Sequence, residues 1–208
     1  MKKMKKLFKN KKGFTLIEMI VVLAIIGILA AVLTPMLTSY MKDAKLRRAQ
    51  SDTKMIASAV QACAKDLGDY PIWRDGRKRT ANDPAFYALY TSDGDTPATG
   101  SGVSIPSTSQ MDTIENQLVD NEPSGHSSYA YPTTGTRKWM GPYLEKVGAD
   151  PWGNKYYVDV RGLWPSNINS MMPAFVVSAG PNKRLETKFA QTGPSITVGG
   201  DDIVFRIK

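Results

Sequence analysis

The chain has 208 residues, with 27 Lys and Arg against 19 Asp and Glu, and a formal net charge of +8 at pH 7. Seven of the basic residues lie among the first twelve positions, so the remainder of the chain carries 20 basic against 19 acidic side chains. The net positive charge therefore arises from the N-terminus and does not indicate a nucleic-acid partner. The chain has a single cysteine, Cys63, which excludes an intramolecular disulfide.

The first element in chain order is a lysine-rich segment followed by a long apolar run. Seven Lys occur in residues 1–13, and Glu18 is then the last charged side chain before Lys42. About 20 apolar residues of helix are enough to cross the hydrocarbon core of a bilayer. The run therefore predicts a transmembrane segment, and the lysines favour the cytoplasmic side for its N-terminus.

The sequence predicts that one helix runs from Thr15 to Leu67. Thr15 and Glu18 have the spacing of a capping box, in which the two side chains satisfy free amides at the start of a helix. Gly68 is a suitable C-terminal cap, and Pro71 prevents continuation. Such a helix is about 80 Å long at roughly 1.5 Å per residue, which is longer than a head of this size needs.

The two halves of this helix have different patterns. Residues 14–41 are apolar on every side and include Pro35, which we expect to kink or locally melt the helix. Residues 42–68 are amphipathic, and their apolar stripe consists of Ile56, Val60, Cys63 and Leu67. We therefore expect the first half to face lipid or other helices and the second half to pack on a head. Cys63 is interpreted as a core residue and not as a nucleophile.

The head is expected over residues 69–208, and its C-terminal third is the clearest part. Two short helices are expected at 85–90 and 112–119, with a long surface loop at 91–109. β-branched and aromatic runs predict antiparallel strands at 156–160, 174–177 and 203–207. The predicted fold is α+β, with the long helix packed on a small antiparallel sheet.

The sequence Gly-Phe-Thr-Leu-Ile-Glu, at residues 13–18, joins the basic segment to the apolar helix. This junction resembles the N-terminus of type IV pilins and of the pseudopilins of type II secretion. The resemblance implies that a prepilin peptidase cuts after Gly13, releases residues 1–13 as a leader peptide and N-methylates the new N-terminal Phe14. It also implies that the helix later leaves the membrane to form the core of a filament.

Glu18 has two interpretations, which both stay open. An unpaired carboxylate at the centre of a membrane helix raises the free energy of insertion by about 2.5–3.5 kcal/mol. In the first interpretation, Glu18 forms hydrogen bonds with Thr15 in the capping box. The resemblance implies a second partner, the positive amine of Phe14 in a neighbouring subunit, and we favour this intersubunit pair. A proline at the position of Pro35 also recurs in the family, where the resemblance implies local melting during filament assembly.

Two pairs of motifs in the head resemble the major pseudopilin of type II secretion. Gly-Pro-Tyr-Leu at 141–144 precedes Asp-Pro-Trp-Gly-Asn at 150–154, and Ser-Ala-Gly-Pro-Asn at 178–182 precedes Gly-Gly-Asp-Asp-Ile at 199–203. Major pseudopilins have a shorter connection between the helix and the sheet, so residues 72–137 have the character of an insertion.

The second pair of motifs implies a calcium site by the same resemblance. Its ligands would be Asp201 and Asp202, with Asn182 a weaker third. Calcium takes six to eight oxygen ligands, and this chain has Asn182 where the family usually has Asp, as well as a longer connecting loop. The alternative is that Asp201 and Asp202 only begin a strand after a solvated turn.

By this resemblance the chain is predicted to be a major pseudopilin, a structural subunit and not an enzyme. It would cross the bacterial inner membrane once, with its head in the periplasm, and then enter a periplasmic filament. The expected partners are other copies of the chain, the prepilin peptidase, minor pseudopilins, the inner-membrane assembly platform of the secretion system, and lipid before assembly.

Three alternatives stay open. The chain could be a type IV pilus subunit that serves adhesion, motility or DNA uptake, or it could be a minor pseudopilin. It could also be a secreted binding or enzymatic domain with an ordinary signal peptide, since Leu29-Ala30-Ala31 offers small residues for a cut.

Overall fold

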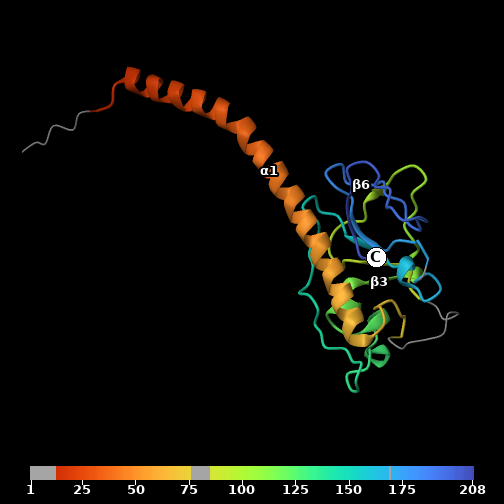
Figure 1. Ribbon diagram of the computed structural model, residues 1–208. Coiled ribbons are helices and arrows are strands. Elements are labelled where there is room, and N and C mark those ends of the chain that lie inside the picture. The colour runs from red at the N-terminus through yellow and green to blue at the C-terminus, as the bar shows by residue number, and fades with distance from the viewer. Residues whose placement is uncertain (1–12, 76–84, 169) are drawn as a thin grey trace, which may run out of the picture. The chain divides into compact units, whose positions relative to one another are not determined.

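The structure is a computed structural model that describes residues 13–75, 85–168 and 170–208 (Figure 1). The expected leader lies outside the described residues except for Gly13, and so do residues 76–84 of the expected insertion. The chain divides into two compact units, one that ends at Asp43 and one over Ala44–Lys208.

Helix α1 spans Leu16–Leu67 and belongs to both units. It begins directly after Thr15 and ends at Gly68, whose φ of +69° and amide bond to the Ala64 oxygen form a C-terminal cap. Both predicted helix boundaries are therefore confirmed.

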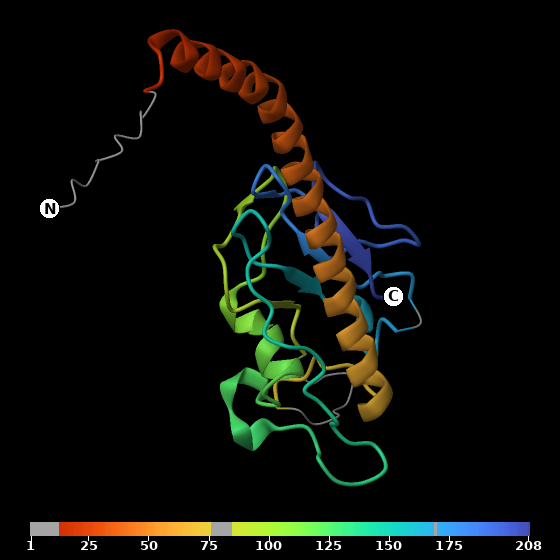
Figure 2. The same cartoon turned by 90° about the vertical axis from the view of Figure 1, so that its left-hand side faces the viewer.

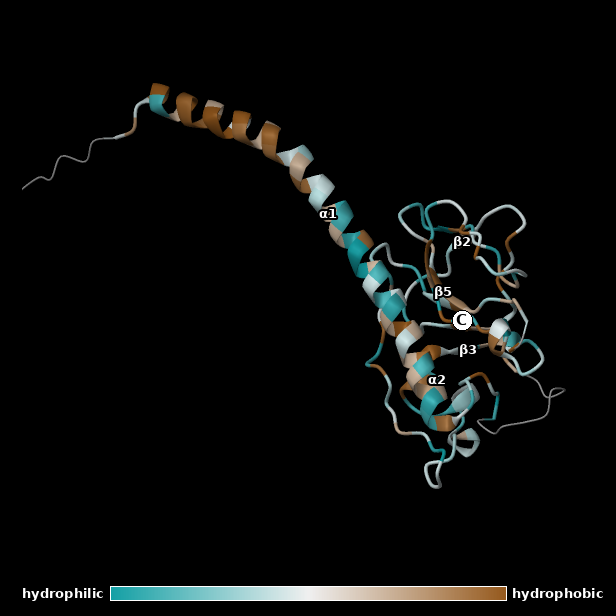
Figure 3. Ribbon diagram, viewed as in Figure 1, coloured by the Kyte–Doolittle hydropathy of each residue, from teal (hydrophilic) through white to brown (hydrophobic). Residues whose placement is uncertain are grey.

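In the first unit, every side chain from Gly13 to Asp43 is exposed. Figure 3 shows that the turns of α1 are strongly hydrophobic here. The helix is long and apolar enough to cross a membrane. It continues through Pro35, where the hydroxyls of Thr34 and Thr38 donate to the carbonyls of Ala30 and Pro35 at 2.7 and 2.8 Å.

The second unit contains a five-stranded sheet in the order β3-β1-β4-β5-β7. Its strands are β1 (Ala88–Tyr90), β3 (Met111–Thr113), β4 (Tyr157–Asp159), β5 (Phe175–Ser178) and β7 (Ile203–Arg206). β1 and β3 pair in parallel, while the other neighbours are antiparallel. A smaller parallel pair joins β2 (Ala98–Thr99) to β6 (Arg184–Leu185). The α+β class is confirmed, and the sheet is mixed, not wholly antiparallel.

The three strands predicted in the C-terminal third are confirmed as β4, β5 and β7. The helix predicted at 85–90 is wrong, because residues 88–90 form β1 between β3 and β4. The helix predicted at 112–119 is present but shorter, as α2 (Ile114–Leu118), since Thr113 ends β3 and caps the helix by accepting from the Asn116 amide. The region predicted as a loop, 91–109, contains β2 and the start of a 3₁₀ turn.

Within the described ranges, the remaining short elements are four 3₁₀ turns. They are η1 (Thr108–Gln110), η2 (Pro123–Gly125), η3 (Ser127–Tyr129) and η4 (Arg161–Leu163).

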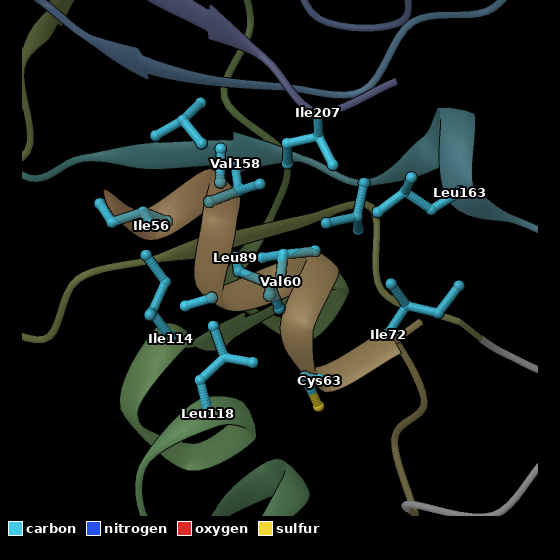
Figure 4. Packing of buried hydrophobic residues seen from close by; sticks show 14 of the residues in the cluster. Ile56, Val60, Cys63, Ile72, Leu89, Ile114, Leu118, Val158, Leu163 and Ile207 are labelled. Carbon is cyan, nitrogen blue, oxygen red and sulfur yellow. The ribbon is translucent and has the colours of Figure 1, made fainter. Parts of the chain in front are cut away.

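The second half of α1 lies across one face of the sheet (Figure 2). Ile56, Val60 and Cys63 of the predicted stripe are fully buried, as Figure 4 shows at close range, while Leu67 is partly buried at the edge. Two polar bonds fix this packing. The Tyr156 hydroxyl donates to Asp52 Oδ2 at 2.9 Å, and Gln61 Nε2 donates to the Ile207 oxygen at 2.8 Å.

The opposite face of the sheet is covered as well. Because successive side chains of a strand alternate between faces, Val158 and Val176 belong to the core under α1, whereas Tyr157, Phe175 and Val177 belong to a second cluster. The second cluster is completed by Leu185 of β6 and by loop residues that include Val103, Phe189 and Ile196. Burial of both faces explains why the C-terminal strands carry apolar side chains at consecutive positions.

The described parts of the insertion are built into the main core. They supply strands β1 and β3 and buried side chains at Ile72, Trp73, Phe86, Leu89, Ile114, Leu118 and Tyr131. The buried Asp112 carboxylate accepts four bonds of 2.6–2.9 Å, from the amides of Thr113 and Ser124 and the side chains of Asn116 and Gln117. Since an unpaired buried carboxylate is costly, this network holds the segment in one conformation.

Leu118→Ala tests whether the insertion is part of the stable core. Leu118 is fully buried, so we expect its truncation to lower the free energy of unfolding by about 2–5 kcal/mol. Urea unfolding of the detergent-solubilised chain, followed by tryptophan fluorescence, measures this, because all four tryptophans lie in the second unit.

Met140→Ala is the matched control, since this side chain is 65% exposed and its truncation should change stability by no more than about 0.5 kcal/mol. Equally small effects of the two variants would show that the insertion does not share the cooperative core.

Candidate functional site

Thr15 and Glu18 form a reciprocal cap at the start of α1. Glu18 Oε2 accepts from the Thr15 amide at 2.8 Å and from its hydroxyl at 2.9 Å, while the Glu18 amide donates to Thr15 Oγ1 at 3.3 Å. The predicted capping box is thus present in the single chain. The pair with the Phe14 amine of another subunit stays a prediction.

The cap lies at the beginning of an extended apolar surface. The side chains of Phe14, Leu16 and Ile17 are 79, 78 and 64% exposed, and the large apolar side chains that follow, as far as Met41, are exposed too. Soluble monomers seldom expose contiguous apolar patches larger than a few hundred Å². Glu18 is the only ionisable side chain from Gly13 to Met41 apart from the phenol of Tyr40. In lipid or in a helix bundle, a positively charged partner would therefore stabilise the Glu18 carboxylate.

The C-terminal loop brings the three residues of the implied calcium site together. Asp201 Oδ2 accepts from the Asn182 amide at 3.1 Å. Asp202 Oδ2 accepts from the amides of Glu186 and Thr187, the first at 2.9 Å. The structure thereby also places Glu186 in this cluster, which the sequence had not indicated.

Both polar atoms of the Asn182 side chain form a hydrogen bond within the loop. Its Oδ1 accepts from the Arg184 amide at 2.6 Å, and its Nδ2 donates to Glu186 Oε2 at 2.9 Å. Asn182 is therefore placed to orient Glu186.

Asp202 is the most deeply buried acid of the loop. It is 8% exposed, and its Oδ1 has no hydrogen-bond partner among the residues that the structure describes. Burial raises the pKa of Asp202 above its ordinary value, and the nearby Glu186 carboxylate adds to this, whereas hydrogen bonds from Thr187 and Glu186 oppose it. Among the described residues, no group of three or more His, Cys, Asp or Glu side chains is gathered closely enough to hold a metal ion.

Cys63 lies inside the core. The side chain is fully buried, and burial raises the pKa of its thiol to about 12. A nucleophilic cysteine needs access and a lowered pKa, so the interpretation of Cys63 as a core residue is supported on both counts.

Comparison with known protein families finds a match at the N-terminus of the chain. A family profile described as the prokaryotic N-terminal methylation motif matches residues 8–34. This motif is the one that the N-terminal segment shares with the type IV pilin and pseudopilin superfamily. Proteins of this superfamily are structural, which confirms the prediction that this pilin-like protein is not an enzyme.

The curated relatives are of two kinds. The type IV major fimbrial protein FimA of Dichelobacter nodosus is 43% identical over 56 residues, which are 27% of this chain and 36% of the relative. The type II secretion system core protein G of Pseudomonas aeruginosa is 38% identical over 76 residues, 36% of this chain and 54% of the relative. A fimbrial protein of Pseudomonas aeruginosa is 29% identical over 150 residues, 71% of this chain and 94% of the relative.

The pilin-like chain thus spans about a third of the length of the FimA proteins that it matches. No solved structure is significantly similar to it.

Thiol labelling tests the placement of Cys63. In the folded chain at pH 8, a maleimide or an aromatic disulfide reagent should react with Cys63 at least about a hundredfold more slowly than in urea, because the thiol is buried and protonated. A Ser128→Cys variant supplies an internal control, since Ser128 is exposed and its thiol should react at once. Rapid labelling of Cys63 in the folded chain would contradict its burial.

Proposed function

We propose that this chain is the major pseudopilin of a type II secretion system, a subunit that polymerises through residues 14–41 into a periplasmic filament that helps to export folded proteins. The observation that carries the proposal is the fully exposed apolar half of α1 with Glu18 at its start. This surface needs an apolar environment. The methylation motif supports the proposal that a bundle of identical helices provides this environment after assembly.

The mechanism begins with the cut after Gly13. Before cleavage, the lysine-rich leader holds the N-terminus on the cytoplasmic side, and the apolar half of α1 crosses the inner membrane with the head in the periplasm. Cleavage by the prepilin peptidase creates a positive amine at Phe14, and this amine keeps its charge after methylation.

Assembly then pairs charges inside an apolar bundle. Each Glu18 meets the Phe14 amine of a neighbouring subunit, so that both charges enter the bundle together. Two charges of opposite sign attract strongly at low dielectric, whereas an unmatched Glu18 opposes entry. The pair therefore favours one register between neighbouring helices. Minor pseudopilins and the inner-membrane assembly platform are the other expected partners.

Two observations support a secretion filament. The similarity to core protein G extends over 76 residues of this chain. Asp150 of the Asp-Pro-Trp-Gly-Asn motif is buried, accepts from the amides of Trp152 and Asn154 at 3.0 and 2.8 Å, and accepts from the Ser178 hydroxyl at 2.7 Å. The two motif pairs that resemble major pseudopilins are thus joined to each other through Asp150 and Ser178.

A type IV pilus subunit is the second candidate. It is favoured by the fimbrial relative whose alignment covers 71% of this chain, and by the FimA proteins at 43% identity. Processing and helix stacking would be the same, and the role of the filament would differ.

Glu18→Gln separates the cap from the intersubunit charge pair. Glutamine keeps an oxygen that can accept from Thr15 but removes the negative charge. We expect cleavage after Gly13 to be intact and the filament yield to fall at least about tenfold. The chain is co-expressed with the peptidase and the assembly platform, cleavage is followed by mass spectrometry, and filaments are counted by electron microscopy.

Thr15→Val is the matched control, because it removes the capping hydroxyl and leaves Glu18 charged; its filament yield should stay close to normal. The reverse pattern, with filaments from Glu18→Gln and none from Thr15→Val, would show that the cap and not the charge pair matters.

Deletion of the gene in its host distinguishes the two filaments. For a pseudopilin, we expect proteins normally exported to accumulate in the periplasm while surface pili stay unchanged, because the filament serves export. Immunoblotting of the medium and the periplasm, with electron microscopy of whole cells, gives both readouts. Loss of long surface fibres with normal secretion would favour the pilus subunit instead.

A further inference from the structure

We propose that Lys42, Lys45 and Arg47, together with Tyr40, form a band around α1 that binds the headgroups of anionic phospholipids at the periplasmic surface of the membrane. This inference rests on the membrane insertion in the proposed function, and it gives the inserted chain a specific lipid partner. It holds equally for a pilus or a pseudopilus subunit, because both insert before they assemble.

The first support is the position of the band along the helix. The 23 residues from Met19 to Met41 carry no charged side chain, and they extend for about 35 Å at roughly 1.5 Å per residue. The hydrocarbon core of a bilayer is about 30 Å thick, so a modestly tilted helix spans it with Met41 at the far edge. Lys42 and Lys45 then lie within about 6 Å of that edge, where the headgroups begin. Figure 3 shows hydrophobic turns of α1 giving way to hydrophilic ones.

The second support is charge without a partner inside the chain. Residues 40–48 contain four basic side chains and one acid, Asp43, so their formal net charge is +3. Lys42, Lys45 and Arg47 are exposed, and none of them forms an ion pair with another described residue. Their positive charge is therefore available to a ligand outside the chain.

The fourth basic side chain, Arg48, is directed to the head. Its Nε lies 3.5 Å from Asp52 Oδ2, and its guanidinium donates to the Ala149 oxygen at 3.3 Å. Arg48 is therefore not part of the band.

The third support is the arrangement of the band around the helix. Lys42 and Lys45 are three positions apart and share one face. Arg47 is five positions from Lys42 and lies on nearly the opposite side, at about 100° per residue, together with Tyr40. A docked protein covers one face of a helix, whereas headgroups surround a lone membrane helix on every side. The band therefore suits lipid better than a single protein partner.

The side chains of the band match anionic phospholipids in chemistry. Lysine and arginine attract phosphate and donate hydrogen bonds to it, and each basic residue beside a membrane span strengthens binding to an anionic surface about fivefold. Tyr40 is 60% exposed, and tyrosine suits the membrane surface because its ring is apolar and its hydroxyl is polar. Zwitterionic phospholipids carry a compensating positive charge, so the band should prefer anionic ones.

Local enrichment of phosphatidylglycerol around the full chain tests the proposal. A Ser39→Cys variant carries a fluorophore beside the band, since Ser39 is exposed whereas Cys63 is buried. The chain is reconstituted into phosphatidylcholine vesicles with a small fraction of nitroxide-labelled phosphatidylglycerol or nitroxide-labelled phosphatidylcholine. We expect the labelled phosphatidylglycerol to quench at least about threefold more strongly, and about 0.5 M NaCl to remove most of this preference by screening. Equal quenching by the two lipids would overturn the proposal.

Two matched variants assign the preference to the band. Lys42→Gln/Lys45→Gln should lower the quenching ratio at least about twofold, and adding Arg47→Gln should lower it further. Lys54→Gln/Lys65→Gln is the control, because these exposed lysines lie on the same helix but at least about 18 Å beyond Lys42, farther than charges act through salt solution. Equal ratios for the two double variants would overturn the role of Lys42 and Lys45.

Filament yield is a separate readout, because quenching is measured on chains that have not assembled. Filaments from a chain without lipid preference would overturn the band and leave the proposed function standing. A lipid preference in a chain that forms no filaments would do the reverse.

Discussion

The apolar half of α1 imposes the constraint on which the rest of the molecule depends. From Phe14 to Met41 its side chains are exposed and uncharged except at Glu18, and the hydrophobic effect disfavours such a surface in water. A bilayer and a bundle of similar helices are the two environments that can cover it. Thr15 satisfies Glu18 in the single chain, whereas a bundle made of processed chains offers a positive amine. One helix can thus serve first as an anchor and then as a filament core.

The second half of the same helix packs inside the head. Its stripe of Ile56, Val60 and Cys63 is buried inside the head, so it contributes to folding. A chain without an intramolecular disulfide must hold its loops by packing and polar bonds. Asp112 and Asp202 accept backbone amides from other loops, and Asp150 accepts amides within its own turn. Of these three acids, Asp202 has a buried oxygen without a hydrogen-bond partner in the part of the chain that the structure describes.

Local patterns predicted the long helix and the C-terminal strands, because capping residues, apolar periodicity and β-branched runs are encoded within a few residues of one another. Residues 85–90 were assigned to the wrong element, since Ala-Phe-Tyr-Ala-Leu-Tyr has no decisive local preference and becomes a strand only between β3 and β4. The two-residue pair of β2 and β6 depends on distant contacts. Glu186 was missed for the same reason, because its position against Gly200 exists only in the folded loop.

The most direct test of the account is the distance between Glu18 and the Phe14 amine in assembled filaments. Filaments can be grown from a mixture of chains labelled with ¹⁵N at Phe and chains labelled with ¹³C at Glu, so that any coupling arises between subunits. Solid-state NMR should detect coupling between the α-amine of Phe14 and the carboxylate carbon of Glu18 at a separation of about 4 Å, as for an ion pair. Filaments that form without this coupling, or whose chains lack Phe14 at the N-terminus, would contradict the account.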